Sequence, residues 1–340
     1  GVTIAETYDD EVIEKIYNAY HNRILRVVMN SDGSLEKELL ASVGEAVYFN
    51  QASEKGWNRL TEIFTKPSLQ FATFSITEKG YTLTDVSGAL TQAAKEDIQN
   101  GPEKPKTNMG AIAHLLYARY NAGKLPIAMV STDNFSQNGL KLETEVLRVA
   151  EGWLKNGFVD QEFIAYLKDP QKVSFPWTMI DRITPNPAQS VADRLKSSGF
   201  ADTTILHTKK HTNIAPFGNT EKTHYLVIED NFPNGRPQLE KAGVILTDRE
   251  TVNDADQMKV TAYDDLLGLI KALGYKEDLP VVKDPKIINP KKFIDELITM
   301  RLPNKNIPDT PQRIASDTSQ KIAIRYGVTI QHYLDDPQLD

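Results

Sequence analysis

The chain has 340 residues, of which 40% are hydrophobic and 25% are charged, so disordered and collagen-like classes are excluded. Its 39 Lys and Arg against 46 Asp and Glu give a net charge of -7, which argues against a nucleic-acid partner. No apolar run approaches the ~20 residues that span a bilayer. Because cysteine is absent, disulfides, thiolate metal sites and a cysteine nucleophile are excluded. We expect an acidic α/β protein without a membrane partner, compatible with the reducing cytoplasm.

The first part of the chain alternates strand-like and helix-like segments. Short apolar runs predict strands at residues 1–6, 69–77 and 126–132. Helical patterns fill the intervals, at residues 10–20, 86–99, 109–120 and 140–155. This order favours a mostly parallel sheet covered by helices on both faces. Two later strands are expected to extend the sheet, with antiparallel pairing as one option, at residues 203–209 and 224–229.

The pattern changes to helices separated by prolines from about residue 254. The predicted helices are 264–273, 290–300, 311–325 and 328–334. We therefore predict two domains, an α/β domain over residues 1–255 and a mainly helical domain over residues 256–340.

The glycine-rich phosphate-binding patterns G-x-G-x-x-G and G-x-x-x-x-G-K-[ST] do not occur in the chain. The sequence does begin with a strand that ends in an acid, Glu6, and in a nucleotide-binding fold an acid at the end of the second strand accepts the ribose hydroxyls. Together with Asp9 and Asp10 it would repel a 2′-phosphate, which favours NAD over NADP. Alternatively, these acids only stabilise the N-terminus of the next helix. His207 and His211 flank two lysines, and a solvated face is favoured there over a metal site.

Four further segments combine polar, charged and aromatic residues. Residues 131–139 follow a buried strand, where α/β sheets bind ligands, and otherwise form a polar loop that caps a helix. Residues 175–185 mix aromatic, acidic and basic side chains, and otherwise form a rigid turn with an Asp–Arg ion pair. Residues 228–237 end a strand in a turn, for which a structural role is the alternative. Residues 311–321 place two cations about two helical turns apart, facing an oxygen-rich ligand or merely solvent.

Together with Thr-Glu-Lys-Gly-Tyr at residues 77–81, these segments resemble the polyol-specific long-chain dehydrogenases in order and spacing. That family includes mannitol 2-dehydrogenase, fructuronate reductase and tagaturonate reductase, and the resemblance covers nearly the whole chain. It implies an expanded Rossmann domain followed by a largely helical domain, with the active site between them. It further implies NAD as cofactor, a small sugar acid or polyol as substrate, and a monomer or weak oligomer.

The resemblance also assigns roles to individual residues. Lys259 matches the catalytic lysine, which takes the hydroxyl proton in oxidation and returns it in reduction; such a lysine needs burial or neighbouring cations to lower its pKa. Asn134 matches the asparagine that stabilises the developing alkoxide, and Glu78 an acid that relays protons to solvent. The implied substrate ligands are Asp181, Arg313 and Lys321. The implied cofactor contacts are Glu6, Thr77, Lys79 and Ile180. No metal is implied, because lysine and asparagine replace the Lewis acid of zinc dehydrogenases.

The sequence departs from the family in two places. The family opens with a strand and a glycine-rich loop, whereas this sequence begins at what resembles the second strand. The family also follows its catalytic lysine with an N-x-x-H pattern, which supplies a second oxyanion donor and a substrate-binding histidine. Here Thr261 runs directly into Ala262 without that pattern. We expect that stretches of the natural protein are absent from this sequence, with one join between these two residues.

The resemblance implies that the protein interconverts D-fructuronate and D-mannonate, because residues 131–139 and 225–237 are closer to the uronate branch than to the mannitol branch. A carboxylate substrate also suits Arg313 and Lys321. Mannitol 2-dehydrogenase and tagaturonate reductase activities stay open within the family. A sugar-acid-binding protein without catalysis is the alternative outside it, favoured by the missing glycine loop and N-x-x-H segment.

Overall fold

The alternation of apolar runs and helical patterns produces parallel strand pairs. In the computed structural model of the chain, β5 (Phe71–Phe74), β6 (Ile127–Ser131) and β7 (Val173–Ser174) form a parallel sheet with β6 at its centre. β1 (Val2–Glu6) and β4 (Val43–Tyr48) form a second parallel pair. Every residue of β6 is buried, as expected for a strand covered on both faces. The predicted mostly parallel α/β fold is confirmed.

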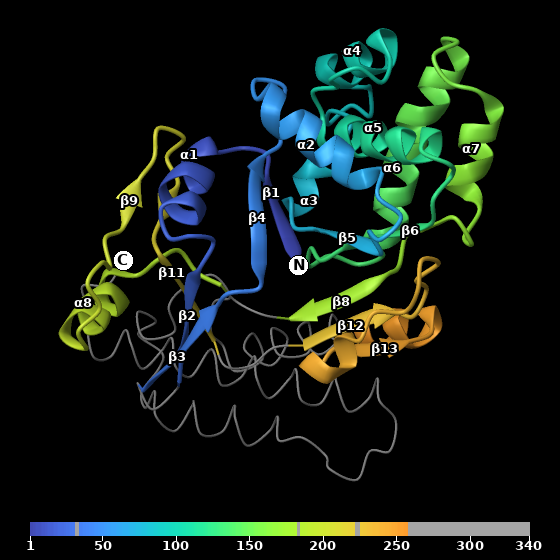
Figure 1. Cartoon of the computed structure of the whole chain (residues 1–340). Coiled ribbons are helices and arrows are strands. Elements are labelled where there is room, and N and C mark those ends of the chain that lie inside the picture. The colour runs from blue at the N-terminus through green and yellow to red at the C-terminus, as the bar shows by residue number, and fades with distance from the viewer. Residues whose placement is uncertain (31–33, 182–183, 222–224, 258–340) are drawn as a thin grey trace, which may run out of the picture. The chain divides into compact units, whose positions relative to one another are not determined.

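The structure describes residues 1–30, 34–181, 184–221 and 225–257 (Figure 1). The chain divides into two compact units. The larger unit is made of Gly1–Leu226 and Asp230–Val244; the smaller one is made of Val227–Glu229 and Ile245–Asp340. The four helices predicted between residues 264 and 334 lie outside the described residues.

The smaller unit contains a parallel strand pair. The last three residues of β12 (Tyr225–Glu229) pair with β13 (Ile245–Thr247), in a register that begins with Val227 opposite Ile245. The antiparallel option considered for the strand at residues 224–229 is therefore wrong for this pair. A helix follows β13 over the described residues 249–257, and the Asp248 carboxylate accepts a hydrogen bond from Thr251 N at its start.

The remaining strands of the larger unit are short or lie in small sheets. β2 (Ile24–Met29) pairs in parallel with β11 (Phe217–Glu221) and antiparallel with β3 (Leu35–Leu40). The strand predicted at residues 203–209 is reduced to a two-residue hairpin arm, β9 (Leu206–His207), paired antiparallel with β10 (Asn213–Ile214). Residues 175–185, for which a rigid turn was the structural alternative, contain the strand β8 (Thr178–Asp181).

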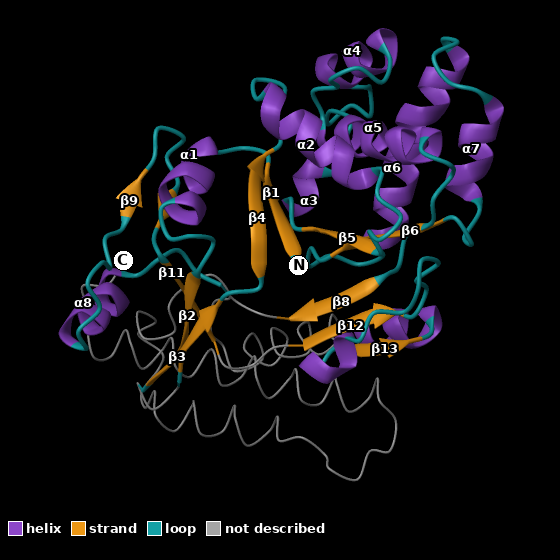
Figure 2. Cartoon of the chain, viewed as in Figure 1, coloured by secondary structure: helices purple, strands orange, loops and turns teal. Residues whose placement is uncertain are grey.

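Five helices of the larger unit pack with the β5–β7 sheet into one hydrophobic core. Figure 2 shows these helices grouped beside β5 and β6. They are α2 (Glu54–Phe64), α4 (Gln92–Asn100), α5 (Asn108–Asn121), α6 (Asn138–Lys155) and α7 (Gln161–Lys168). The other helical segments are α1 (Asp10–Val12), the π-helix η1 (Ile13–Asn18), α3 (Thr77–Gly80), α8 (Gln189–Ser197) and the 3₁₀-helix η2 (Leu239–Ala242). Within the described ranges, no helix combines the length and apolar character needed to cross a bilayer.

Side-chain caps explain where several helices begin. Ser53, Thr91, Thr107 and Asp160 each accept a hydrogen bond from a backbone N–H in the first turn of the following helix, a contact typically worth about 1 kcal/mol. The helix predicted to begin at residue 86 starts only at Gln92. The reason is local: the Asp85 carboxylate accepts hydrogen bonds from Ser87 N and Ala89 N, and this turn competes with helix formation.

Candidate functional site

The carboxyl ends of β5 and β6 lie at the same edge of the parallel sheet. Phe74 pairs with Ser131 in their register, so the chain leaves both strands side by side. The single-turn helix α3 follows β5, and a loop that leads into α6 follows β6. Because open α/β sheets bind ligands at this edge, it is the candidate site. The segments that follow these strand ends carry four predicted site residues with exposed side chains: Thr77, Glu78, Lys79 and Asn134.

A buried carboxylate, Asp133, joins the two strand ends. It is 9% exposed and accepts hydrogen bonds from the backbone N–H groups of Ile76 (2.9 Å) and Thr77 (3.0 Å). Thr77 has a left-handed φ of 60°, which is unusual for a β-branched residue. Such a conformation costs on the order of 1–3 kcal/mol and persists only where neighbouring contacts enforce it. The two hydrogen bonds to Asp133 supply such contacts directly before Glu78.

Tyr81 supports this carboxylate with a hydrogen bond. Its hydroxyl donates to Asp133 Oδ2 at 2.6 Å and lies 2.7 Å from Ser131 Oγ. Burial raises the pKa of the fully buried Tyr81 phenol, and the hydrogen bond to Asp133 raises it further. The phenol therefore stays protonated at all ordinary pH values and remains a hydrogen-bond donor to Asp133.

A buried amide, Asn138, connects the same loop to β8. Its Nδ2 donates to the carbonyl of Asp133 (2.9 Å) and to Thr178 Oγ1 (2.8 Å), while its Oδ1 accepts from Thr178 N (3.0 Å). Thr178 Oγ1 in turn donates to the carbonyl of Ser131 at 2.7 Å. The start of β8 is therefore fixed against the end of β6 by a chain of side-chain hydrogen bonds.

The remaining predicted site residues divide into two groups. β8 carries Ile180, whose side chain is half-buried, and ends at Asp181, whose side chain is not among those described. Lys259, Arg313 and Lys321 lie outside the described residues. The structure therefore brings the chain segments of the α3 turn, Asn134 and β8 to one edge, and the roles of all these residues stay predictions.

Gly139 is required by the close approach of α6 to the segment before β8. A Cβ at this position would lie 2.5 Å from the carbonyl oxygen of Phe175 and 2.7 Å from that of Pro176. We expect Gly139→Ala to lower the free energy of unfolding by about 1–3 kcal/mol, because neither backbone segment can yield easily. Urea unfolding measures this loss. Gly218→Ala is the matched control, since a Cβ there has open space, and an equal loss in both variants would contradict the prediction.

Glu6 lies at the end of β1 and is half-buried. Its Oε1 accepts hydrogen bonds from Tyr8 N (2.7 Å) and Asp9 N (3.1 Å), so it stabilises the turn into α1. This is the structural role that the sequence left open beside cofactor binding. The assignment of Glu6 to the cofactor stays a prediction.

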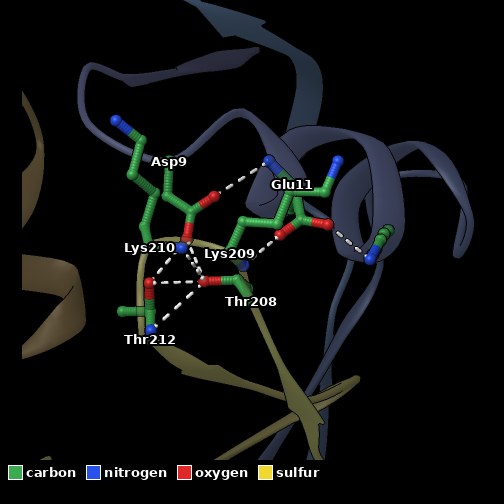
Figure 3. Close-up of polar contacts among 7 residues, drawn as sticks. Asp9, Glu11, Thr208, Lys209, Lys210 and Thr212 are labelled. Atoms are coloured by element: carbon green, nitrogen blue, oxygen red, sulfur yellow. Dashed lines mark hydrogen bonds and ion pairs between the residues drawn. The ribbon is translucent and has the colours of Figure 1, made fainter.

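Asp9 and Glu11 fasten the hairpin of β9 and β10 to the start of α1 (Figure 3). Asp9 is 1% exposed and accepts hydrogen bonds from the hydroxyl groups of Thr208 (2.6 Å) and Thr212 (2.5 Å). Burial alone would raise the pKa of Asp9, but these hydroxyl donors bring it below its ordinary value. Glu11 accepts from Lys209 N at 2.7 Å. Asp9 thus binds the hairpin, and its expected part in repelling a 2′-phosphate stays a prediction.

The hairpin also carries the two histidines that the sequence singled out. Both side chains are exposed, and His207 Nδ1 lies 2.9 Å from Asn213 Oδ1. Across the part of the chain that the structure describes, no cluster of three or more His, Asp or Glu side chains is arranged to hold a metal ion.

A separate groove of about 600 Å³ lies between α1, η1, β4 and α2. Its charged lining combines acids and bases, and Arg59 is already paired with Glu45 at 2.8 Å. Asp10, one of the acids expected to repel a 2′-phosphate, lines it, whereas no residue of the segments that follow β5 and β6 does. It is therefore distinct from the site at the ends of β5 and β6.

Sequence reasoning missed the residues that hold the site together. Asp133 and Asn138 lie in the segment 131–139 and Tyr81 in the segment 77–81, so both segments were recognised without these roles. The signal that was present is a buried strand followed by Asp and Asn, both of which favour hydrogen bonds to backbone N–H groups. Nothing local shows which N–H groups they bind.

Comparison with known proteins identifies the family. The family model described as the mannitol dehydrogenase Rossmann domain matches residues 6–241. The D-mannonate oxidoreductase of Thermotoga maritima is 47% identical over an alignment of 367 positions, which covers 100% of this chain and 68% of that protein. The chain therefore spans about two thirds of the length of this relative.

Two solved structures share the fold. A substrate-free D-sorbitol dehydrogenase superposes with a TM-score of 0.68 at 21% identity, covering 100% of this chain and 71% of its own. The mannitol 2-dehydrogenase of Pseudomonas fluorescens, in a ternary complex with NAD and D-mannitol, superposes with a TM-score of 0.65 at 24% identity and covers 94% and 60%. The expected Rossmann-like architecture is confirmed in the described residues. The chain belongs to the mannitol dehydrogenase family of oxidoreductases.

Proposed function

We propose that the protein is an NAD-dependent oxidoreductase that interconverts D-fructuronate and D-mannonate. The observation that carries this proposal is the 47% identity, over the whole chain, to the D-mannonate oxidoreductase of Thermotoga maritima. Identity of this extent favours the uronate branch over the mannitol branch of the family.

The residues at the strand ends fit a nicotinamide cofactor. Asp133 fixes the peptide groups before α3, so the exposed side chains of Thr77 and Lys79 are presented at the edge where α/β sheets bind nucleotides. In the proposal, Thr77, Lys79 and Ile180 hold the nicotinamide half, and Glu6 accepts a ribose hydroxyl on its Oε2. When bound, the cofactor supplies the hydride for reduction and accepts it in oxidation. The acids Glu6 and Asp10 favour NAD over the 2′-phosphorylated NADP.

Lys259 and Asn134 are proposed to act on the oxygen of the reacting carbon. In reduction, Lys259 donates its proton to the carbonyl oxygen, and in oxidation it takes the hydroxyl proton back. The Asn134 amide donates a hydrogen bond to the same oxygen while it carries negative charge. Glu78, exposed in the α3 turn, restores the lysine proton from solvent. Asp181, Arg313 and Lys321 bind the open-chain substrate, the two cations taking its carboxylate.

The domain roles follow from this assignment. Residues 1–255 bind the cofactor, and residues 256–340 supply the catalytic lysine and the cationic substrate ligands. The family match, which ends at residue 241 within the first of these ranges, supports this division.

The proposal is tested by following NADH absorbance with the purified protein and D-fructuronate, D-tagaturonate or D-fructose, each at equal concentration. We expect the fastest oxidation with D-fructuronate, and slower oxidation when NADPH replaces NADH. Preference for D-fructose would move the protein to the polyol branch, and preference for D-tagaturonate to the other uronate reductase. Without turnover of any of the three, a fluorescence titration with NADH decides whether the chain is a non-catalytic binding protein.

A further inference from the structure

We infer that Asp133 is a positioning residue for the proposed hydride-transfer reaction: it sets the α3 turn, with Thr77 and Glu78, against Asn134. This inference rests on the proposed function, because it assigns Asp133 to the reaction that those residues serve. Asp133 acts through its neighbours and does not touch the substrate.

The side chain and the backbone of Asp133 join two segments of the site. The side chain of Asp133 reaches across to the β5 end of the sheet and takes the N–H groups of Ile76 and Thr77, while its own peptide bond leads directly to Asn134. One residue thus links the turn that carries Glu78 to the loop that carries Asn134. A displacement of one segment against the other must break at least one of these hydrogen bonds.

The hydrogen bonds to Asp133 also enforce an unusual backbone conformation. Thr77 is held at a φ of 60°, a region that β-branched residues avoid. Strain of this kind is kept only where surrounding contacts over-determine the backbone, and it is concentrated at functional sites. Because Thr77 immediately precedes Glu78, release of its N–H group would let the turn relax and move both side chains.

Asp133 is itself held in place by two buried side chains. The buried Tyr81 hydroxyl donates to Asp133 Oδ2, and Asn138 Nδ2 donates to the Asp133 carbonyl. Residues that position catalytic groups need such support from a rigid second set of contacts. Three chain segments, those after β5 and β6 and the start of β8, therefore meet at Asp133 and its neighbour Asn138.

The molecule contains a second carboxylate with almost the same hydrogen-bonding pattern, and it serves as the control. Asp97 is 2% exposed and accepts from Lys106 N (2.6 Å), Thr107 N (2.8 Å) and Thr107 Oγ1 (2.6 Å). Each of the two aspartates thus takes two consecutive backbone N–H groups and one hydroxyl. Asp97 fixes the loop before α5, which carries none of the proposed site residues.

The test compares Asp133→Asn with Asp97→Asn. Each substitution keeps the shape of the side chain and places an NH₂ group where a second acceptor is needed. We expect both to lower stability to a similar degree in urea unfolding. Because small displacements of reacting groups can cost about 100-fold, we expect Asp133→Asn to reduce kcat with D-fructuronate about 10- to 100-fold, with little change in KM. Asp97→Asn should leave kcat close to that of the unsubstituted protein.

The inference would be overturned if the two variants had equal kcat, or if Asp133→Asn changed KM and left kcat unaltered. Tyr81→Phe removes one of the donors to Asp133 and keeps the carboxylate, so we expect a smaller loss of kcat in the same direction. If Asp133→Asn does not yield folded protein, the Tyr81→Phe variant tests the inference in its place. An unchanged kcat in Tyr81→Phe would then contradict the positioning role of Asp133.

Amide hydrogen exchange separates this inference from the proposed function. Asp133→Asn should speed exchange at Ile76, Thr77 and the loop 134–138, and leave the amides of Lys106 and Thr107 protected. If the unsubstituted protein turns over none of the sugar acids, the proposed function fails and exchange alone decides whether Asp133 sets the α3 turn. Unchanged exchange at Ile76 and Thr77 would refute that role.

Discussion

Arg119→Met is expected to lower the free energy of unfolding of the larger unit by about 3–5 kcal/mol, a loss at the upper end for single substitutions. The methionine fills most of the same space but donates no hydrogen bond, so several buried carbonyl groups lose their partner. All three tryptophans of the chain, Trp57, Trp153 and Trp177, lie in this unit. Urea unfolding followed by tryptophan fluorescence therefore measures the loss.

The size of the effect follows from the surroundings of the guanidinium group. Arg119 is fully buried in α5, and burial lowers its pKa. All its hydrogen bonds in the larger unit go to uncharged backbone carbonyls within 3.1 Å: those of Phe64, Lys66, Leu69, Leu125 and Pro126. These carbonyls belong to the last residue of α2 and the chain from there to β5, and to the chain between α5 and β6. One side chain thus holds the entrances to both strands whose other ends form the candidate site.

Two further variants serve as controls for the charge and for the burial of Arg119. Arg119→Lys keeps the positive charge, but its three N–H donors sit on a single nitrogen and cannot reach carbonyls that are spread around a guanidinium group. We therefore expect this variant, too, to lose much of its free energy of unfolding. Arg59→Met removes an arginine that is 40% exposed and pairs with Glu45 and Glu62, and exposed pairs contribute about 0–1 kcal/mol. A loss for Arg119→Met no greater than that for Arg59→Met would show that water replaces the buried guanidinium.

Elements with a strong local pattern were predicted closely from the sequence. β6 (Ile127–Ser131) lies within the predicted strand 126–132, and α6 (Asn138–Lys155) begins two residues before the predicted helix 140–155 and ends with it. In both, burial follows the pattern of apolar residues along the chain. Short strands such as β8 were missed because four residues carry too little periodicity to be told from a turn.

The site was predictable only in its outline. The segment after β6 was recognised because polar residues follow a buried strand, but its decisive contacts join Asp133 to Ile76 and Thr77, which are far away in the sequence. Those contacts depend on the register of β5 with β6, which the sequence does not display. Arg119 is a similar case: its helix is apolar on nearly all sides, which indicates burial, yet nothing local shows which carbonyls receive its donors.

Asn134→Ala is expected to lower kcat with D-fructuronate by about 10²–10³, which corresponds to about 2.7–4 kcal/mol in the barrier. In the proposed mechanism the side-chain amide donates to the substrate oxygen while that oxygen gains negative charge, and the methyl group of alanine donates nothing. Asn134 follows the buried Asp133 at the end of β6 and is itself exposed, so its truncation should leave the hydrogen bonds of Asp133 intact. Initial rates of NADH oxidation measure the loss.

Asn134→Asp separates the donor role from shape. The aspartate has the size of the asparagine, but its carboxylate faces a developing negative charge, so kcat should fall at least as far as in Asn134→Ala. Leu140→Ala is the control on the same stretch of chain, because it shortens an exposed apolar side chain in the first turn of α6 and removes no donor. If Asn134→Ala raised KM and left kcat unchanged, Asn134 would be assigned to substrate binding alone. An aspartate variant more active than the alanine variant would show that a donor at this position is not what the reaction needs.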